Sequence, residues 1–305
     1  MNFTEKVKQE LANDIPNSRH CRLAELGGML SVLGRYEDAS GNLVIVSDNE
    51  LVIKIIEKLL NKIFLVDNTD RILYDINRLG KEKSRIVFSE KATEEVLLAV
   101  KLNKFSLLAD PVLYTMTCCK RAYLKGVFLG AGSLTDPNKE YHFEISLADE
   151  KRAANLRDLI CEFEAEAKIV LRKKQYVVYV KDSEMISEIL NVMGAPVAMM
   201  ELENVKIYKD VRNRVNRQVN CDSANINKAL TASRRQLSDI AYIREKTGFK
   251  GIPEELKETA ILRERYPEAT LAELVVYNGG TVGKSGINHR LKKLSELASK
   301  LKEGL

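Results

Sequence analysis

The pattern of hydrophobic and polar positions in the first two thirds of the chain occurs twice. Residues 24–34 and 122–132 are apolar helix patterns rich in glycine, and they lie 98 residues apart. After each comes the same order of further elements: strand, amphipathic helix, two strands and a closing helix. This repeated order predicts a duplicated domain with pseudo-two-fold symmetry.

The individual elements follow from short β-patterned apolar runs for the strands and from amphipathic patterns for the helices. In the first half we predict helices over residues 24–34, 49–61 and 90–102, and strands over residues 42–47, 71–77 and 84–89 with a polar turn at 80–83. In the second half we predict helices over residues 122–132, 150–164 and 183–192, and strands over residues 141–147, 168–172 and 175–181. The predicted fold class of this part is α+β.

Glycine occurs inside both of the central helix patterns, although each glycine in a helix costs about 1 kcal/mol relative to alanine. Gly27 and Gly28 lie on the first pattern, and Gly126 and Gly130 lie on the second. Small residues allow two helix backbones to approach more closely than usual. We therefore predict that the two helices pack side by side, with Gly28 and Gly126 at their contact.

The last third of the chain has an all-helical pattern. Helices are predicted over residues 254–265, 270–277 and 284–299, and a glycine-rich turn over residues 278–283 separates the last two. Thr270 and Glu273 have the spacing of a capping box at the start of the short helix. A short helix, a glycine-containing turn and a basic second helix are typical of a helix-turn-helix domain.

The last helix has two distinct faces at 100° per residue. Ile287, Leu291, Leu294 and Ala298 form one narrow apolar stripe that is expected to face the core. The candidate DNA-binding residues are polar and lie opposite or beside this stripe: Ser285, His289, Lys292 and Lys293 on the opposite face, and Lys284, Asn288 and Arg290 flanking it. The competing interpretation is an amphipathic helix with ordinary solvated lysines.

Charge divides unevenly along the chain. Residues 205–305 contain 20 Lys and Arg against 12 Asp and Glu, whereas the remainder is slightly acidic. A basic domain suggests a polyanionic partner, here double-stranded DNA. A second set of candidates for contact with DNA, or for docking between domains, is basic and lies in the segment before the predicted helix-turn-helix: Arg212, Arg214, Arg217, Arg234 and Arg235. A solvated helical linker explains this segment equally well.

Metal and cofactor chemistry is not predicted. The five cysteines are scattered, and the adjacent Cys118 and Cys119 fit neither a zinc knuckle nor a CxxC pair, so reduced thiols are expected. His20 and His142 are interpreted as surface or hydrogen-bonded histidines. No cofactor or small-molecule substrate is expected. The absence of a signal-peptide pattern and of a long apolar run predicts a cytoplasmic protein with no membrane partner. Because DNA is the expected partner, the protein is expected to be nucleoid-associated.

Residues 26–34 (LGGMLSVLG) and 124–132 (LKGVFLGAG) resemble the nine-residue motif of the LAGLIDADG homing endonucleases. The resemblance implies that the residue before the last glycine is the acidic metal ligand in active enzymes. Here Leu33 and Ala131 occupy these positions, and neither can bind Mg²⁺. We therefore predict no metal site and no catalytic residue. Asp38 and Asp136 follow the motifs and are interpreted as a solvated residue and a turn residue.

Four blocks along the whole chain are similar to the WhiA family: the opening FTEKVKQELA with CRLAELGGML, residues 118–145, residues 213–236 and residues 281–298. The resemblance implies a regulator of transcription that binds DNA through its C-terminal domain. It further implies a role in sporulation, cell division or chromosome segregation.

The expected domains are a degenerate LAGLIDADG-like domain over residues 1–204, a basic linker over 205–221 and a helix-turn-helix domain over 222–305. The first of these is expected to divide into halves of about 1–105 and 106–204. Two alternatives to a DNA-binding regulator stay open. One is a non-enzymatic cell-division scaffold whose N-terminal domain binds another protein, and the other is an active homing endonuclease.

Overall fold

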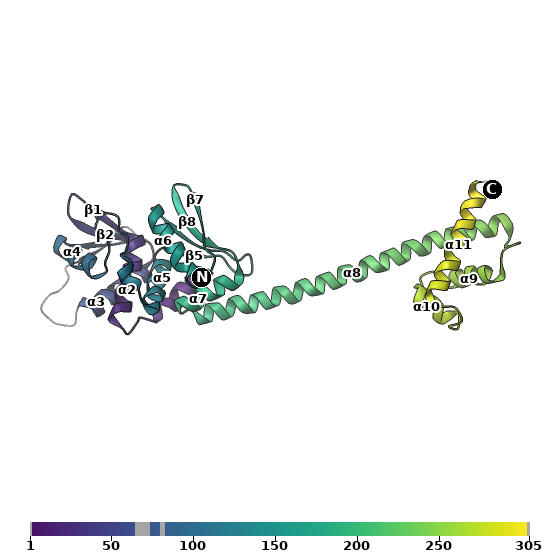
Figure 1. The fold of residues 1–305 in the computed structure, drawn as a ribbon, viewed down its shortest axis with the longest axis horizontal. Helices are drawn as coiled ribbons and strands as arrows, with labels where there is room; N and C mark the ends of the chain where they lie inside the picture. Colours follow the sequence, from purple (N-terminus) through teal and green to yellow (C-terminus); the bar gives the residue numbers. More distant parts are fainter. Residues whose placement is uncertain (1, 65–73, 80–82, 304–305) are drawn as a thin grey trace. The chain divides into compact units, whose positions relative to one another are not determined.

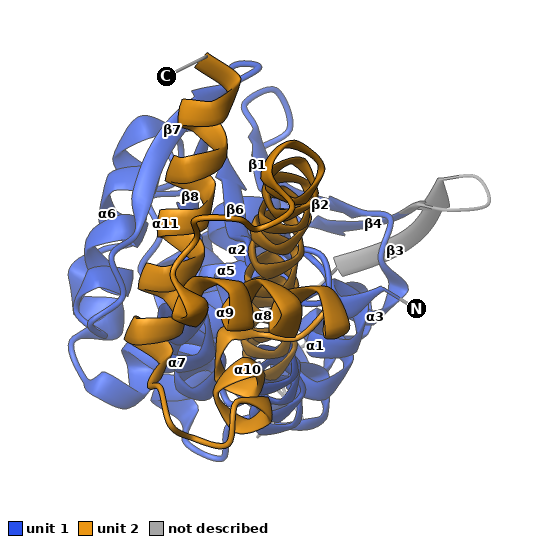
Figure 2. Ribbon diagram, turned by 90° about the vertical axis from the view of Figure 1, so that its right-hand side faces the viewer, with its two compact units in different colours: residues 1–209 blue, residues 210–305 orange. Residues whose placement is uncertain are grey.

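A computed structural model describes residues 2–64, 74–79 and 83–303 of the chain (Figure 1). The chain forms two compact units, unit 1 over residues 1–209 and unit 2 over residues 210–305 (Figure 2). Helix α8 (Pro196–Thr247) begins in unit 1 and continues in unit 2. The domain boundaries expected at residues 204 and 221 both lie inside this helix.

The first half of unit 1 follows the helix α1 (Phe3–Asn13). Its elements are α2 (Arg19–Leu33), β1 (Gly34–Glu37), β2 (Asn42–Ser47), α3 (Glu50–Phe64), β3 (Tyr74–Leu79), β4 (Lys83–Phe88) and α4 (Glu90–Ala99). The four strands form an antiparallel sheet in the order β1-β2-β4-β3. Of the elements predicted here, residues 71–73 and the turn residues 80–82 lie outside the described residues.

The second half repeats this architecture after the short 3-10 helix η1 (Pro111–Tyr114). Its elements are α5 (Thr117–Ala131), β5 (Gly132–Leu134), β6 (Phe143–Leu147), α6 (Glu150–Cys161), β7 (Lys168–Arg172), β8 (Gln175–Val180) and α7 (Ser183–Met193). The strand order β5-β6-β8-β7 matches that of the first half strand for strand. The predicted duplication and the α+β class are confirmed.

Strands β1 and β5 were not predicted from the sequence. Each begins at the last glycine of a motif, and that glycine also caps the preceding helix, since the backbone N–H of Gly34 donates to Leu30 O and that of Gly132 to Phe128 O. A strand of three or four residues that starts inside a helix cap is too short to show alternation.

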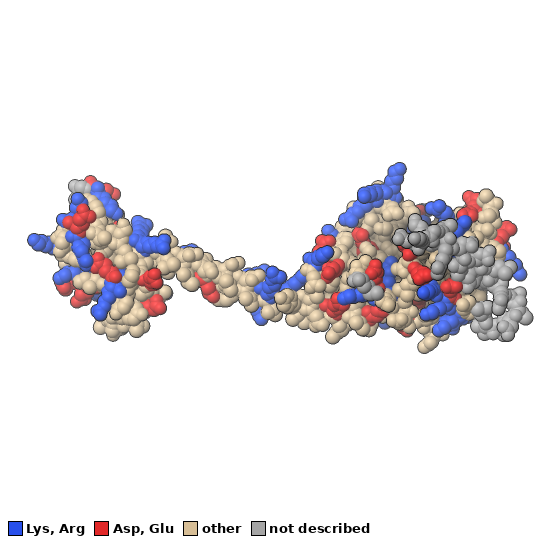
Figure 3. Space-filling view, turned by 180° about the vertical axis from the view of Figure 1, so that it is seen from behind, with Lys and Arg blue, Asp and Glu red and all other residues tan. Residues whose placement is uncertain are grey.

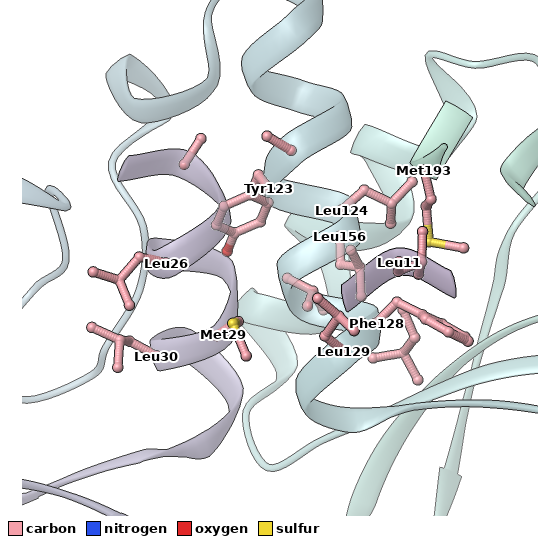
Figure 4. Close-up of a cluster of buried hydrophobic side chains, with 14 of the residues drawn as sticks. Leu11, Leu26, Met29, Leu30, Tyr123, Leu124, Phe128, Leu129, Leu156 and Met193 are labelled. Atoms are coloured by element: carbon pink, nitrogen blue, oxygen red, sulfur yellow. The ribbon is translucent and has the colours of Figure 1, made fainter. Parts of the chain in front are cut away.

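The two central helices α2 and α5 pack directly against each other, and Figure 4 shows their buried side chains. A Cβ atom added to Gly28 would lie 2.3 Å from Tyr123 O, and one added to Gly126 would lie 2.0 Å from Glu25 O. Real Cβ atoms do not approach backbone oxygens this closely, so both positions require glycine. The predicted contact between the glycine helices is confirmed.

One continuous hydrophobic core extends through both halves of unit 1. It includes Leu26 and Leu30 of α2 and Leu124 and Phe128 of α5. Helix α1 precedes the first half and contributes Phe3 and Val7 to this core. It also contacts the second half, since the Thr4 hydroxyl donates to Leu134 O and accepts from Leu134 N, both at 2.8 Å. The two halves therefore form one folding unit with a single core.

Unit 2 contains the end of α8 together with α9 (Glu254–Arg265), α10 (Leu271–Tyr277) and α11 (Lys284–Glu303). Its separate, smaller core joins Ile240 and Ile243 of α8 to Ala260 of α9, Leu274 of α10 and the apolar stripe of α11. The three helices predicted from the sequence are present at nearly the predicted positions.

Candidate nucleic-acid interface

Local sequence determines where the two helices of the candidate motif begin. At the start of α10, the Thr270 hydroxyl accepts from Glu273 N and the Glu273 carboxylate accepts from Thr270 N at 2.7 Å, which is the predicted capping box. In the turn that follows, Gly279 and Gly280 have φ of +68° and +70°. These left-handed conformations favour glycine and end α10 before α11 starts at Lys284.

Helix α11 has the two faces that its sequence predicts. Ile287, Leu291, Leu294 and Ala298 are each at most 1% exposed. The residues on the other side are exposed, and they include Ser285, His289, Lys292 and Lys293. The Lys292 side chain is 75% exposed and lies 3.8 Å from Glu296 on the same helix, a weak surface ion pair.

The flanking candidates separate into two groups. Lys284 and Asn288 are exposed. The Arg290 side chain is only 19% exposed, and its guanidinium lies 3.1 Å from the Glu255 carboxylate of α9. Arg290 therefore ties α11 to α9 in this structure.

A groove of about 720 Å³ lies between α11 and α8 within unit 2. Asn288 and Lys292 line it from α11, and Lys228 and Arg235 line it from α8. The fold thus brings Arg235, a candidate of the second set, beside the candidates of α11.

The other arginines of the second set do not line this groove. Arg234 is exposed and adjoins Arg235 on α8. Arg212, Arg214 and Arg217 are exposed too, but they lie about 27 Å or more from Arg235 along the helix, at 1.5 Å per residue. They form a separate basic segment of α8.

The degenerate motif positions lie at the C-terminal ends of α2 and α5. Leu33 lines a cavity of about 750 Å³ together with Arg35, Arg85 and Arg152, and Ala131 is half-buried. Within the part of the chain that the structure describes, the residues at this end form no group of three His, Cys, Asp or Glu with metal-ligand geometry.

The two aspartates that follow the motifs occupy turns. Asp38 is exposed in the turn between β1 and β2. The Asp136 carboxylate accepts from the backbone N–H and the side-chain amide of Asn138, both at 2.9 Å. Hydrogen bonding from the Asn138 backbone is the main reason why the pKa of Asp136 is lowered. Both residues fit the turn and solvent roles expected from the sequence.

The N-terminal ends of α2 and α5 contain a cluster of one histidine and three cysteines that was not predicted from the sequence. His20 and Cys21 lie in the first turn of α2, and Cys118 and Cys119 lie in the first turn of α5. Their ligand-type atoms all lie within 4.8 Å of one another. The signal was present in the sequence, because the 98-residue repeat relates His20 to Cys118 and Cys21 to Cys119.

Basic and acidic side chains are interspersed on the face of unit 1 that Figure 3 shows. Unit 2 likewise shows side chains of both signs in Figure 3, although the sequence of the C-terminal third has a basic excess. Among the described residues, no helix combines the length and the apolar character needed to cross a membrane.

The fold and the candidate interface define a protein in which a LAGLIDADG-like domain is joined to a helix-turn-helix domain. A family profile for the WhiA LAGLIDADG-like domain matches residues 120–212, and one for the WhiA C-terminal HTH domain matches residues 215–298. The probable cell division protein WhiA of Lachnoclostridium phytofermentans is 44% identical over 99% of this chain and 100% of its own. The chain belongs to the WhiA family.

Two further comparisons agree with this family assignment. The probable cell division protein WhiA of Alkaliphilus oremlandii is 38% identical over 100% of this chain and 99% of its own. The crystal structure of full-length WhiA from Thermotoga maritima is 24% identical, covers 98% of this chain and 99% of that chain, and has a TM-score of 0.59. At this identity, the similarity to the crystal structure shows a shared fold.

Proposed function

We propose that this protein binds double-stranded DNA through unit 2 and regulates transcription, with a role in cell division, chromosome segregation or sporulation. The observation that carries the proposal is the division of α11 into a fully buried apolar stripe and an exposed polar face with Ser285, His289, Lys292 and Lys293. The second helix of a helix-turn-helix motif enters the major groove with such a face.

Each part of the interface has a distinct role in this proposal. On the exposed face, Ser285 and His289 have donors and acceptors of the kind that read base edges in the major groove. Lys292 and Lys293, with Lys228 and Arg235 from the other side of the groove, contact backbone phosphates, which fix the register of the protein on the duplex. Because Arg290 is paired with Glu255, we assign it a structural role.

Unit 1 contributes no nuclease activity in this proposal. In-line hydrolysis of a phosphodiester requires a metal held by oxygen ligands. Leu33 and Ala131 provide none at the motif positions, and Oδ1 of Asp136 already accepts two hydrogen bonds from Asn138 within its turn. Unit 1 is then free to bind another protein, and the nucleoid is the expected location of the whole chain.

The proposal is tested by fluorescence anisotropy with the full-length protein, a DNA duplex and several salt concentrations. Replacing Lys292 and Lys293 by alanine should weaken binding and flatten the dependence of log K on log salt by about 0.9 for each lost phosphate contact. The matched control is Lys54→Ala with Lys58→Ala on α3, since Lys54 likewise forms an exposed i,i+4 pair, with Glu50. Equal losses in both variants would contradict the assignment of α11.

Specificity is tested separately from affinity. His289→Ala should cost about 1–3 kcal/mol of discrimination at a single base pair if the imidazole reads a base edge. Incubating the wild-type protein with supercoiled plasmid and Mg²⁺ or Mn²⁺ should leave the plasmid intact. Metal-dependent nicking that purifies with the protein and is lost in Asp136→Asn would show that the endonuclease alternative is correct.

A further inference from the structure

Three thiols surround one imidazole nitrogen at the N-terminal ends of α2 and α5. His20 Nδ1 lies 3.2 Å from Cys119 Sγ, 3.3 Å from Cys21 Sγ and 4.0 Å from Cys118 Sγ. A single imidazole lone pair accepts one hydrogen bond well, so three neutral thiols gain little by converging on it. All four cysteine and histidine ligand atoms lie within 4.8 Å of one another.

These distances match the edges of a tetrahedral zinc site. With Zn–S bonds of about 2.3 Å and Zn–N bonds of about 2.0–2.1 Å, a regular tetrahedron has N···S edges of about 3.6 Å and S···S edges of about 3.8 Å. The three N···S distances here, 3.2, 3.3 and 4.0 Å, lie on either side of the first value. Only small side-chain movements are needed to complete the geometry.

We propose that His20, Cys21, Cys118 and Cys119 bind one Zn²⁺ ion and fasten the first turns of the two central helices together. Three thiolates and an imidazole are a ligand set that favours zinc over the harder divalent cations. All four positions are filled by protein ligands, so the site is structural and leaves none open for a substrate or water.

Binding of zinc would change the charge of the cluster. On binding, each of the three thiols releases one proton to solvent, and the imidazole binds through Nδ1 as the neutral ring. The occupied site carries a net charge of about −1, from one Zn²⁺ and three thiolates. It lies at two helix N-termini, which favour negative charge, and no side chain caps either helix there.

The position of the site explains why the ligands come in two pairs. His20 and Cys118 are exposed, whereas Cys21 and Cys119 are buried. The 98-residue repeat relates the exposed pair to each other and the buried pair to each other. A duplicated helix start that packs against its own copy therefore brings four ligands together with only two positions per half.

The metal content of the full-length protein, purified under reducing conditions, tests the proposal. Elemental analysis should find about one zinc per chain, and Co²⁺ added to the stripped protein should give the visible absorption of tetrahedral cobalt thiolates. The exposed ligands are the best positions to change because their loss leaves the core intact. Cys118→Ser and His20→Ala should lower metal affinity by more than the roughly 10–100-fold typical of losing an outer hydrogen-bond partner.

Cys161→Ser is the matched control, because Cys161 is an exposed helical cysteine outside the cluster, and this variant should retain the metal. A chelator should lower the Tm of the wild type and the control and leave the two ligand variants unchanged. Three results would overturn the proposal: wild type that neither contains zinc nor binds Co²⁺, ligand variants that retain the metal, or a disulfide between Cys21 and Cys119 in protein trapped at lysis.

Discussion

The residues that distinguish the two units of this protein differ in their exposure to solvent. In unit 1 these residues are buried: Gly28 and Gly126 at the contact of α2 and α5, and Lys125, whose ammonium lies 3.3 Å from the Glu25 carboxylate with both side chains at most 5% exposed. In unit 2 they are exposed, on the polar face of α11 and along the groove beside α8.

This difference teaches which properties a substitution should change in each unit. A buried glycine contact or ion pair affects the free energy of unfolding, because neighbouring atoms cannot move away and charges cannot reach water. An exposed lysine affects binding to a charged partner and hardly affects stability. We therefore expect stability effects to concentrate in unit 1 and binding effects in unit 2.

The largest expected effect is that of Gly126→Ala. The added Cβ would lie 2.0 Å from Glu25 O and 2.9 Å from Glu25 C, so the backbones of α2 and α5 must separate. The substitution should lower the free energy of unfolding of unit 1 by more than about 3 kcal/mol, at the upper end of overpacking costs. Chemical denaturation followed by circular dichroism measures this loss.

Gly283→Ala is the matched control in unit 2, since no heavy atom lies within 4 Å of its added Cβ and its φ is not positive. Its effect on stability should stay within about 1 kcal/mol, because Gly283 precedes α11 and its carbonyl accepts from Ile287 N, an N-cap position where alanine is less favourable than glycine. Similar losses for both variants would show that the contact between the glycine helices tolerates a methyl group, and the contrast between the units would fail.

The next effect in size is that of Lys125→Met, which leaves Glu25 buried without its cation. In the wild type, burial is the main cause that raises the pKa of Glu25 to about 7, and Lys125 opposes it. Because this pKa is higher in the folded than in the unfolded state, the contribution of Glu25 to stability increases as pH falls from about 7 towards 4.5. The variant should lose about 3 kcal/mol at pH 8, the lower end of the cost of breaking a buried ion pair, and clearly less at pH 6, where the carboxyl is protonated.

Urea denaturation at pH 6 and pH 8 measures the difference. The double variant Glu25→Gln with Lys125→Met removes both charges, so its loss should be nearly the same at the two pH values. A loss in Lys125→Met that does not depend on pH would mean that the missing hydrogen bond from Lys125 to Asp14 O, rather than the charge on Glu25, limits stability.

Most of the architecture could be predicted from the sequence because burial imposes periodicity. The stripe of α11 and the strand β6, whose residues alternate between buried and half-buried, have the residue spacing that their buried faces require. The strands β1 and β5 could not be predicted from periodicity, because each has only three or four residues and starts at a capping glycine. The extent of α8 was missed because its central part is exposed on all sides and has no core-facing stripe to detect.

The candidate sites were predictable to different degrees for a similar reason. Neighbours on one helix, such as His289 and Lys293, follow from helical spacing alone. The approach of Arg235 to Lys292, and of His20 to Cys119, depends on how two helices pack, which the spacing along one helix does not reveal. For the histidine and cysteines, the repeat could have predicted this approach. Equivalent residues of two duplicated halves lie close together when they are near the pseudo-two-fold axis.

The smallest expected effect is that of Thr270→Ala, which removes the hydroxyl that accepts from Glu273 N at the start of α10. Loss of an N-cap side chain typically costs about 1 kcal/mol. The loss should appear in the unfolding of unit 2 and as faster amide hydrogen exchange in α10, while the exposed face of α11 and its affinity for DNA change little.

Thr231→Ala, at an exposed helical position of α8, is the control and should be neutral or slightly stabilising, because alanine has the higher helix propensity. If Thr270→Ala is no more destabilising than Thr231→Ala, the capping box does not contribute to the stability of the turn that positions α11. If it instead abolishes DNA binding while unit 2 stays folded, α10 itself contacts DNA, and the interface is wider than the polar face of α11.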